Sequence, residues 1–420
     1  MGPDDQNSYA GGEMLGVSAT LRRRQPGTAS TPEVFDRSEI QDAYGESPEQ
    51  MLDIDSWSGA LDIAESIERV EREVDEAIEQ EDAFHREIRD KLFPMIGDPT
   101  RPFLPKNAGV FEVTSHDLLH AQTEVLFNGG VEACTGICVT HDTLPLSITQ
   151  IGVCLVNYMG GQGAWGHRLF RKDLRVRGGD PLAEAIELLH RRNERGVIHR
   201  AGRRDQLSEL ARRGILRYAE RAILFKRSSR PWRMGYGHPA PYELLTGSGS
   251  MDLLEMSLDL LQRLILDHKR FVFIPSRTVD SMLTSIGYAL RPREFAIVER
   301  DEFRTRPIVE DGNLRGKHRA LAIAFVDNAI AKVVAGVLRT GLHSPPQVFF
   351  AHEDYAEQAA LIAMADSVLQ PARSFPTLID LASSVVQSLF GGDAFNATVQ
   401  NAYARRGDPL RYLNERDARF

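Results

Sequence analysis

Apolar residues recur along this chain with two different spacings, one typical of helices and one typical of strands. From about Ser58 to Lys91 there is no proline and, after Gly59, no glycine. Apolar side chains there follow alternating steps of four and three, interrupted at Glu81, which predicts a long amphipathic helix with a narrow apolar seam. Such a seam suits a partner helix within the chain or across a dimer. The seam positions are Ile63, Ile67, Val70, Val74, Ala77, Phe84 and Ile88.

Residues 109–180 favour strands instead. Short segments rich in β-branched and aromatic residues are separated by Gly, Pro or Asp, and their close spacing predicts an antiparallel meander. The second of these segments, "VEACTGICVTHD" at residues 131–142, reads as a buried strand that the chain leaves through His141 and Asp142.

Residues 181–228 return to a helical period, and "SSRPWRMGYGHPAP" after them reads as a loop. A further helix is predicted from Ser250, the expected N-cap, with Asp252 in its first turn. The short buried strand "RFVFIPS" follows directly. The apolar face of this helix would consist of Leu254, Leu258, Leu261 and Ile265.

The last third of the chain alternates strands and helices, with "HRALAIAFVDNA" ambiguous between the two. Taken together, the elements predict an α/β fold with a mixed sheet flanked by helices. Three regions are expected: a disordered acidic segment over 1–50, a long helix over 51–98, and an α/β domain over 105–420. A basic helical insertion would occupy about 181–235 of that domain.

Composition narrows the class of protein. The 420 residues contain no apolar run long enough to span a membrane, and the first residues lack the apolar core of a secretory signal. Cys134, Cys138 and Cys154 all lie in apolar surroundings. They indicate buried free thiols, and therefore a reducing, cytoplasmic compartment, more than a zinc site.

The net charge of −9 is unevenly distributed. Residues 1–100 hold 24 acidic and 9 basic residues, whereas residues 160–233 hold 19 Lys or Arg and 8 Asp or Glu. The basic stretch indicates a polyanionic partner such as DNA, or else a solvated helix face crossed by salt bridges.

Common catalytic motifs are absent from the sequence. There is no phosphate-binding GxxxxGK[ST] loop and no GxSxG, and "MGGQGAWG" reads as a hairpin turn. His116 and His120 share a helix face without the glutamate of a zincin, so a polar surface helix is favoured. In "AHEDYAEQ", Glu353 and Asp354 close a strand and open a helix. Negative charge at the helix N-terminus explains them without catalysis and is the favoured interpretation. The alternative is an active-site role, because α/β active sites collect at strand ends.

The order of these elements resembles the NurA family of nucleases, which act with the hexameric ATPase HerA in DNA end processing and, in some operons, phage defence. A long N-terminal helix precedes an early β meander, a helix carrying Glu255 leads into the buried strand "FVFI", and "SFPTLIDLA" lies near the C-terminus. The resemblance would cover most of residues 60–405. It implies an RNase H-like arrangement with acids on a first strand, a helix and a later strand.

The acidic motif of that family is only partly present. The family has Asp-Gly-Ser in its first strand, where this chain reads Thr135-Gly136-Ile137. The family's later strand ends in Asp-Gly, where this chain reads Pro275-Ser276. Only Glu255 carries over directly, and neutral residues do not bind Mg²⁺ or Mn²⁺ as carboxylates do.

Three hypotheses follow. The first is a metal-dependent DNA nuclease, expected to be dimeric, with Mg²⁺ or Mn²⁺ held by a shifted set of carboxylates. Its catalytic and metal-binding residues would be Glu255, Asp142 and Asp280, with Asp354 as a further metal ligand. Its phosphate-binding residues would be Arg203, Arg204, Arg212 and Arg213.

The second hypothesis is a catalytically inactive NurA-like scaffold. It would bind a HerA-type ATPase or a nuclease through the acidic N-terminal helix and hold DNA with the basic segment. The third is an unrelated α/β hydrolase that acts on a small substrate through His352 or His141.

Overall fold

A computed structural model describes residues 41, 44–57, 63–98, 104–143, 145–160, 162–172, 182, 209–276 and 280–412. The chain divides into two compact units, Met1–Phe84 and His85–Phe420. No described helix combines the length and the apolar character that crossing a membrane requires.

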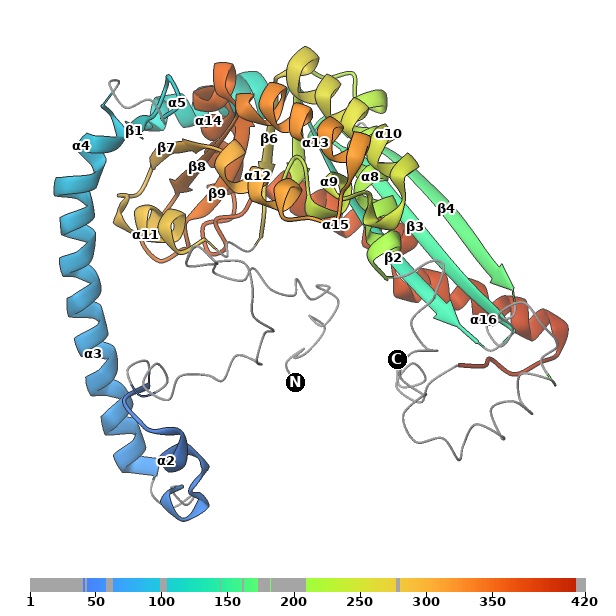
Figure 1. Ribbon diagram of the computed structural model, residues 1–420, viewed down its shortest axis with the longest axis horizontal. Helices are drawn as coiled ribbons and strands as arrows, with labels where there is room; N and C mark the ends of the chain where they lie inside the picture. Colours follow the sequence, from blue (N-terminus) through green and yellow to red (C-terminus); the bar gives the residue numbers. More distant parts are fainter. Residues whose placement is uncertain are drawn as a thin grey trace. The chain divides into compact units, whose positions relative to one another are not determined.

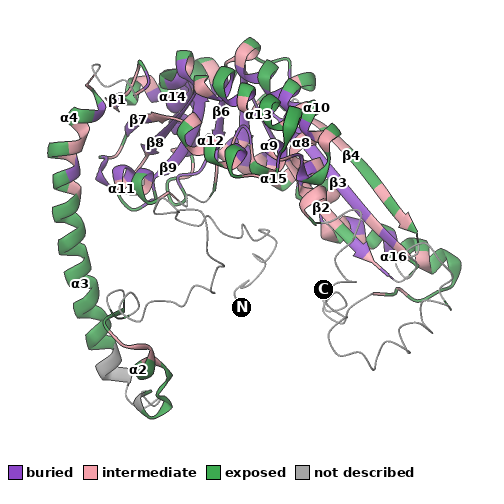
Figure 2. Ribbon diagram, viewed as in Figure 1, coloured by how far each residue is buried: buried purple, intermediate pink, exposed green. Residues whose placement is uncertain are grey.

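The first unit contains short helical turns and most of one long helix. Helix α2 (Pro48–Leu52) is capped by Ser47, whose side chain accepts a hydrogen bond from the Gln50 amide, and the turn η1 (Ile54–Ser56) follows. Helix α3 (Ile63–Glu87) is the long helix predicted from the four-and-three spacing. Its seam residues from Ile67 to Phe84 are exposed, and most of the α3 ribbon is green in Figure 2. The helix continues through a π-helical turn, η2 (Ile88–Leu92), into α4 (Phe93–Ile96) in the second unit.

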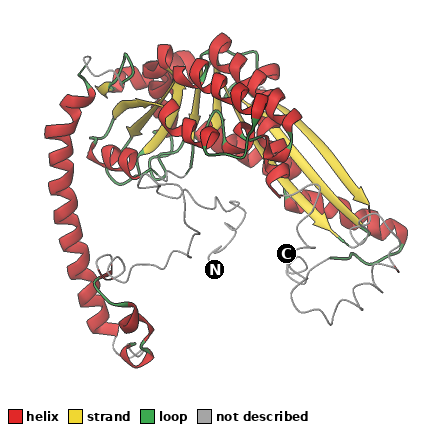
Figure 3. Ribbon diagram, viewed as in Figure 1, coloured by secondary structure: helices red, strands yellow, loops and turns green. Residues whose placement is uncertain are grey.

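The second unit is built on one nine-stranded sheet (Figures 1 and 3), with the strand order β1-β7-β8-β9-β6-β5-β2-β3-β4. Strands β2, β3 and β4 form the predicted antiparallel meander, whereas β2, β5 and β6 run parallel to one another. The strands are β1 (Gly109–Glu112), β2 (Val131–Asp142), β3 (Leu146–Val156), β4 (Gln162–Lys172), β5 (Trp232–Tyr236), β6 (Phe271–Ile274), β7 (Glu294–Arg300), β8 (Val333–Arg339) and β9 (Gln347–His352).

Helices cover both faces of this sheet because successive strand residues point to opposite sides. In β6, for example, Phe271 and Phe273 enter one core, and Val272 and Ile274 enter the other. One face packs against α8 (Glu209–Arg227), α9 (Tyr242–Leu245), α10 (Met251–Arg263), α11 (Ser281–Ala289), α12 (Glu302–Glu310) and α13 (Gly316–Asn328). The other packs against α5 (Ser115–Ala121), α14 (Ala356–Ser367) and α15 (Thr377–Phe390), and α16 (Gly392–Arg406) ends the described fold. The predicted α/β fold with a mixed sheet flanked by helices is therefore confirmed.

Helix α10 also agrees closely with its sequence pattern. Ser250 caps the helix by accepting a hydrogen bond from the Leu253 amide, and the predicted apolar face is buried. A π-helical turn, η5 (Leu264–His268), then leads into β6. The succession of α10, η5 and β6 determines the positions of Glu255 and of the end of β6.

Two local predictions need correction, and one segment that the sequence leaves open is resolved. The segment predicted as a loop contains β5, because Trp232 and Met234 point into one core while the strand is held between β2 and β6. The ambiguous segment is helix α13. His141 and Asp142 do not leave β2 but belong to it, paired with Ile148 and Ser147 of β3.

Candidate functional site at the carboxyl ends of the parallel strands

The parallel strands β5 and β6 end side by side, and the end of β5 lies beside the middle of β2. The carboxyl ends of parallel strands are where ligands commonly bind in open α/β sheets. The β2–β5 pairing stops at Cys134 and Gly235, while β2 runs on to Asp142. Thr135 and Gly136 therefore lie level with the end of β5. Ser276 follows β6 at the same edge, since its hydroxyl is 2.7 Å from that of Tyr236.

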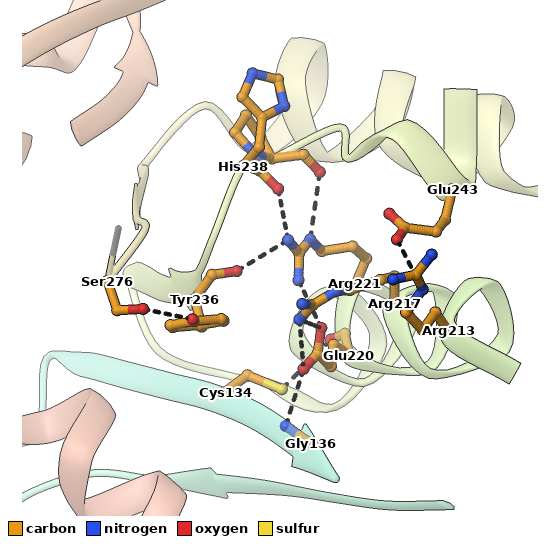
Figure 4. Close-up of polar contacts among 11 residues, drawn as sticks. Cys134, Gly136, Arg213, Arg217, Glu220, Arg221, Tyr236, His238, Glu243 and Ser276 are labelled. Carbon is orange, nitrogen blue, oxygen red and sulfur yellow. Dashed lines mark hydrogen bonds and ion pairs between the residues drawn. The ribbon is translucent and has the colours of Figure 1, made fainter. Parts of the chain in front are cut away.

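Glu220 of α8 occupies the position beside β2 where β5 has ended. Its Oε1 accepts a hydrogen bond of 3.0 Å from the Gly136 amide (Figure 4). The Glu220 side chain is almost fully buried. Gly136 permits this approach, because a Cβ there would lie 2.7 Å from Leu216 of the same helix. The Thr-Gly step of β2 therefore meets a carboxylate that comes from a helix.

Two arginines neutralise this carboxylate. Glu220 Oε2 lies 3.1 Å from Arg217 and 3.0 Å from Arg221. Arg221 is itself buried and also donates to the carbonyl oxygens of Tyr236, His238 and Pro239 (Figure 4). Burial lowers the pKa of Arg221 to about 10, which still leaves the guanidinium charged at neutral pH. The pair joins β2 to the loop that follows β5.

The outer side of this network is basic and partly open to solvent. The Arg217 guanidinium lies 5.6 Å from the centre of the Tyr236 ring and keeps about a quarter of its side chain exposed. Arg213, one turn earlier on α8, is 3.5 Å from Glu243 and is 38% exposed. Guanidinium groups with exposed donors are well suited to bind phosphate or carboxylate oxygens.

The carboxylates predicted to bind metal have other partners. Glu255 Oε1 is exposed on α10 and lies 3.2 Å from Lys317 and 3.3 Å from His318. The Lys317 ammonium lowers the pKa of this carboxyl. Asp142 accepts a hydrogen bond from the Ser147 hydroxyl at the far end of β2.

Asp280 and Asp354 likewise have structural roles. Asp280 caps α11 through the Leu283 amide and pairs with Arg304. Burial alone would raise the pKa of Asp280, but the hydrogen bonds from Arg304 and Leu283 lower it overall. Asp354 lies 3.0 Å from Lys269, whose ammonium lowers the pKa of Asp354.

The described residues do not fit a divalent metal ion. Among them, no three His, Cys, Asp or Glu side chains gather in an arrangement that could bind a metal. The four predicted carboxylates do not form one metal-coordination shell, because each is held by a different cation, hydroxyl or helix end. They are Glu255, Asp142, Asp280 and Asp354. Glu220, the carboxylate that does reach the strand ends, already has two guanidinium partners, which a cation would have to displace.

The remaining predicted residues are distributed as follows. Arg212 and Arg213 lie on α8, whereas Arg203 and Arg204 fall outside the described residues. His141 is buried against the rings of Tyr403 and Tyr412. His352 caps the turn η7 (Glu353–Tyr355), and burial lowers its pKa.

Sequence reasoning missed Glu220 and Arg221. The available signal was a pair of opposite charges inside an otherwise amphipathic helix, "YAERAILF", but charge pairs of this kind are common on solvated helix faces. Only the tertiary structure shows that this pair is buried.

Comparison with known proteins gives weak structural likenesses. No protein-family model and no curated protein matches the sequence. The NurA nuclease from Sulfolobus solfataricus is 10% identical, with a TM-score of 0.40 over 80% of this chain and 98% of that one. NurA bound to dAMP and manganese is 8% identical, with a TM-score of 0.37 over 84% of this chain and 99% of that one. Endonuclease V from Ciona intestinalis is 11% identical, with a TM-score of 0.24 over 65% and 94%. Scores this low carry no functional weight, so any proposal depends on the residues themselves.

Proposed function

We propose that this protein is a NurA-like DNA-processing protein that binds the DNA backbone beside α8. One observation supports this most directly: the Glu220 carboxylate at the strand ends is neutralised by two arginines, one of which, Arg217, is partly exposed, and the partly exposed Arg213 lies one turn away on the same helix. Arg212, Arg213 and Arg217 are the proposed phosphate contacts. In this form the protein acts as a scaffold that holds DNA, since the described residues provide cations where a nuclease needs metal-binding acids.

Replacing Arg212 and Arg213 together by alanine is expected to weaken DNA binding about 10-fold at low salt and to reduce the salt dependence by about two ion equivalents. The expected reason is the loss of two phosphate contacts. Fluorescence anisotropy with labelled single- and double-stranded DNA across a salt series measures both quantities.

The matched control for this experiment is Arg373→Ala. Arg373 is an exposed arginine paired with Asp380, next to α15 on the opposite face of the sheet. Its replacement is expected to leave affinity and salt slope unchanged. Equal losses in the two variants would show that binding is spread over the whole surface and would remove α8 as the site.

A metal-dependent nuclease is the second candidate function, and one observation favours it. Cys134 faces α8, since its thiol donates to the Glu220 carbonyl, so strand alternation places Asp142 on that same face. Glu255 also lies on this side, on a helix that packs with α8. Two of the predicted acids are therefore on the side of the sheet where DNA is proposed to bind.

Incubation with DNA and Mn²⁺ separates the two functions. For the scaffold, we expect binding without cleavage, and Glu255→Gln should leave affinity unchanged. Mn²⁺-dependent cleavage that Glu255→Gln abolishes would instead establish the nuclease, with Asp142→Asn and Asp280→Asn as the next variants. Absence of DNA binding at low salt would contradict both.

Two partners are proposed from the NurA resemblance: a HerA-type hexameric ATPase and a second copy of this chain. The same resemblance supports a proposed role in DNA end processing or phage defence. Co-expression with the ATPase encoded nearest to this gene, followed by measurement of complex mass by light scattering, tests the first two. A monomer that does not associate with the ATPase would contradict both.

A further inference from the structure

Helix α3 presents an apolar seam to solvent in the described structure. The seam side chains of Ile67, Val70, Val74 and Phe84, and that of Ile78 beside the seam, are each about half exposed, between 48% and 58%. Isolated exposed apolar residues are common, but five on one face of a helix indicate a surface suited to packing against another element. The four-and-three spacing is that of a helix which packs lengthwise against one other helix.

The charge on α3 identifies the kind of occupant. Residues 63–87 contain ten Asp or Glu and three Arg, and Glu71 and Glu73 flank the seam. Two copies of this helix side by side would bring these like charges together. A helix with Lys or Arg beside its apolar line would instead place opposite charges across the interface.

Glu81 strengthens this choice, because it occupies the seam position where the apolar pattern is interrupted. In a parallel pair of identical helices, Glu81 would face its own copy within the interface, which is unfavourable for two like charges. A Lys or Arg on the partner at this level would pair with Glu81 and fix the alignment of the two helices.

We propose that α3 is a docking helix for a partner protein, and that the partner contributes a basic amphipathic helix to it. The inference is independent of DNA binding, since it uses only the first unit of the chain, whereas the proposed DNA contacts all belong to α8 in the second. The proposed partner helix is basic, whereas α3 of a second copy of this chain is acidic, so an experiment can distinguish these two binding partners.

The experiment uses the full chain and two labelled synthetic peptides with the same leucine seam. One peptide has Lys and Arg at the flanking positions and the other has Glu. The basic peptide is expected to bind at low salt and to weaken as salt rises, whereas the acidic peptide is not expected to bind. The double variant Val70→Ser/Val74→Ser is expected to lose at least about 10-fold in affinity, because the seam is removed while the charge stays the same.

A second variant, Glu73→Lys/Glu81→Lys, separates the seam from simple charge attraction. It is expected to weaken the basic peptide and to gain affinity for the acidic one. Both variants are expected to keep their helix content, which circular dichroism checks, and DNA affinity measured in parallel should be unchanged. Undiminished binding of the basic peptide to the seam variant would overturn the proposal. So would a wild-type dimer that the seam variant dissociates, since a second copy would then be the occupant.

Discussion

Replacing Arg221 by methionine is expected to lower the free energy of unfolding by about 3–5 kcal/mol. Arg221 is 2% exposed and donates hydrogen bonds to one carboxylate and three carbonyl oxygens. Methionine fills a similar volume but donates no hydrogen bond. One buried and two partly buried carbonyls would lose a donor, and Glu220 would keep only Arg217 and the Gly136 amide.

The matched control for Arg221→Met is Arg263→Met. Arg263 pairs with Asp259 one turn away on α10, and both side chains are about half exposed or more. An exposed pair of this kind contributes little, so Arg263→Met is expected to change stability by no more than about 0.5 kcal/mol. Urea unfolding followed by circular dichroism measures both variants. Equal effects would show that the Glu220–Arg221 pair is not buried in solution.

A double variant tests whether the two charges act as one unit. Glu220→Gln alone keeps an acceptor for the Gly136 amide but leaves two arginines without their counter-charge. Glu220→Gln combined with Arg221→Met removes both buried charges. Its destabilisation is expected to be smaller than the sum of the two single effects by more than about 1 kcal/mol. Strict additivity would contradict the network.

Elements with long amphipathic patterns are the part of the fold that can be derived from the sequence. Periodicity identified α3, α10 and the β2–β4 meander, because each has a long amphipathic pattern, and the Ser250 cap is a local signal. Strand β5 was missed, because five residues between proline- and glycine-containing segments provide almost no periodicity. Only pairing with β2 and β6 makes it a strand.

The candidate site was harder to predict than the fold, because its residues depend on tertiary contacts. A family resemblance directs attention to Thr135, Glu255 and Ser276, and two of these do lie at the strand ends. The carboxylate found there is Glu220, which lies far along the chain from Thr135 and hydrogen-bonds to a backbone amide. Neither spacing nor residue type reveals that α8 packs over Gly136.

Asp366 forms a second buried polar cluster, on the other face of the sheet. Its carboxylate is fully buried at the end of α14, where it accepts hydrogen bonds from the Tyr158 hydroxyl and from the Leu378 amide at the start of α15. Burial raises the pKa of Asp366 to about 6, against an ordinary value of 3.8, although both hydrogen bonds act to lower it. The carboxyl therefore binds its proton more tightly in the folded chain than in the unfolded chain.

This difference predicts how Asp366 makes stability depend on pH. Because the folded pKa is raised, the contribution of Asp366 is fully present below about pH 4 and is lost as pH rises through about 6. The shift of about two units corresponds to roughly 3 kcal/mol. Asp366→Asn has no proton to lose at this position. The free energy of unfolding of the variant, relative to that of wild type, is therefore expected to rise by about that amount between pH 4 and pH 7. The substitution also changes stability by an amount that does not depend on pH, and this does not affect the rise.

Chemical unfolding of wild type and Asp366→Asn at a series of pH values measures this difference directly. Subtracting the two curves removes the opposite contributions of carboxyls with lowered pKa values, such as Asp280 and Glu294. Tyr158→Phe provides an independent test, because it removes a hydroxyl that stabilises the charged carboxylate. In that variant the loss of stability is expected to continue to higher pH than in wild type. Parallel curves for wild type and Asp366→Asn would show that Asp366 does not hold its proton in the folded protein, and would place its carboxylate in contact with water.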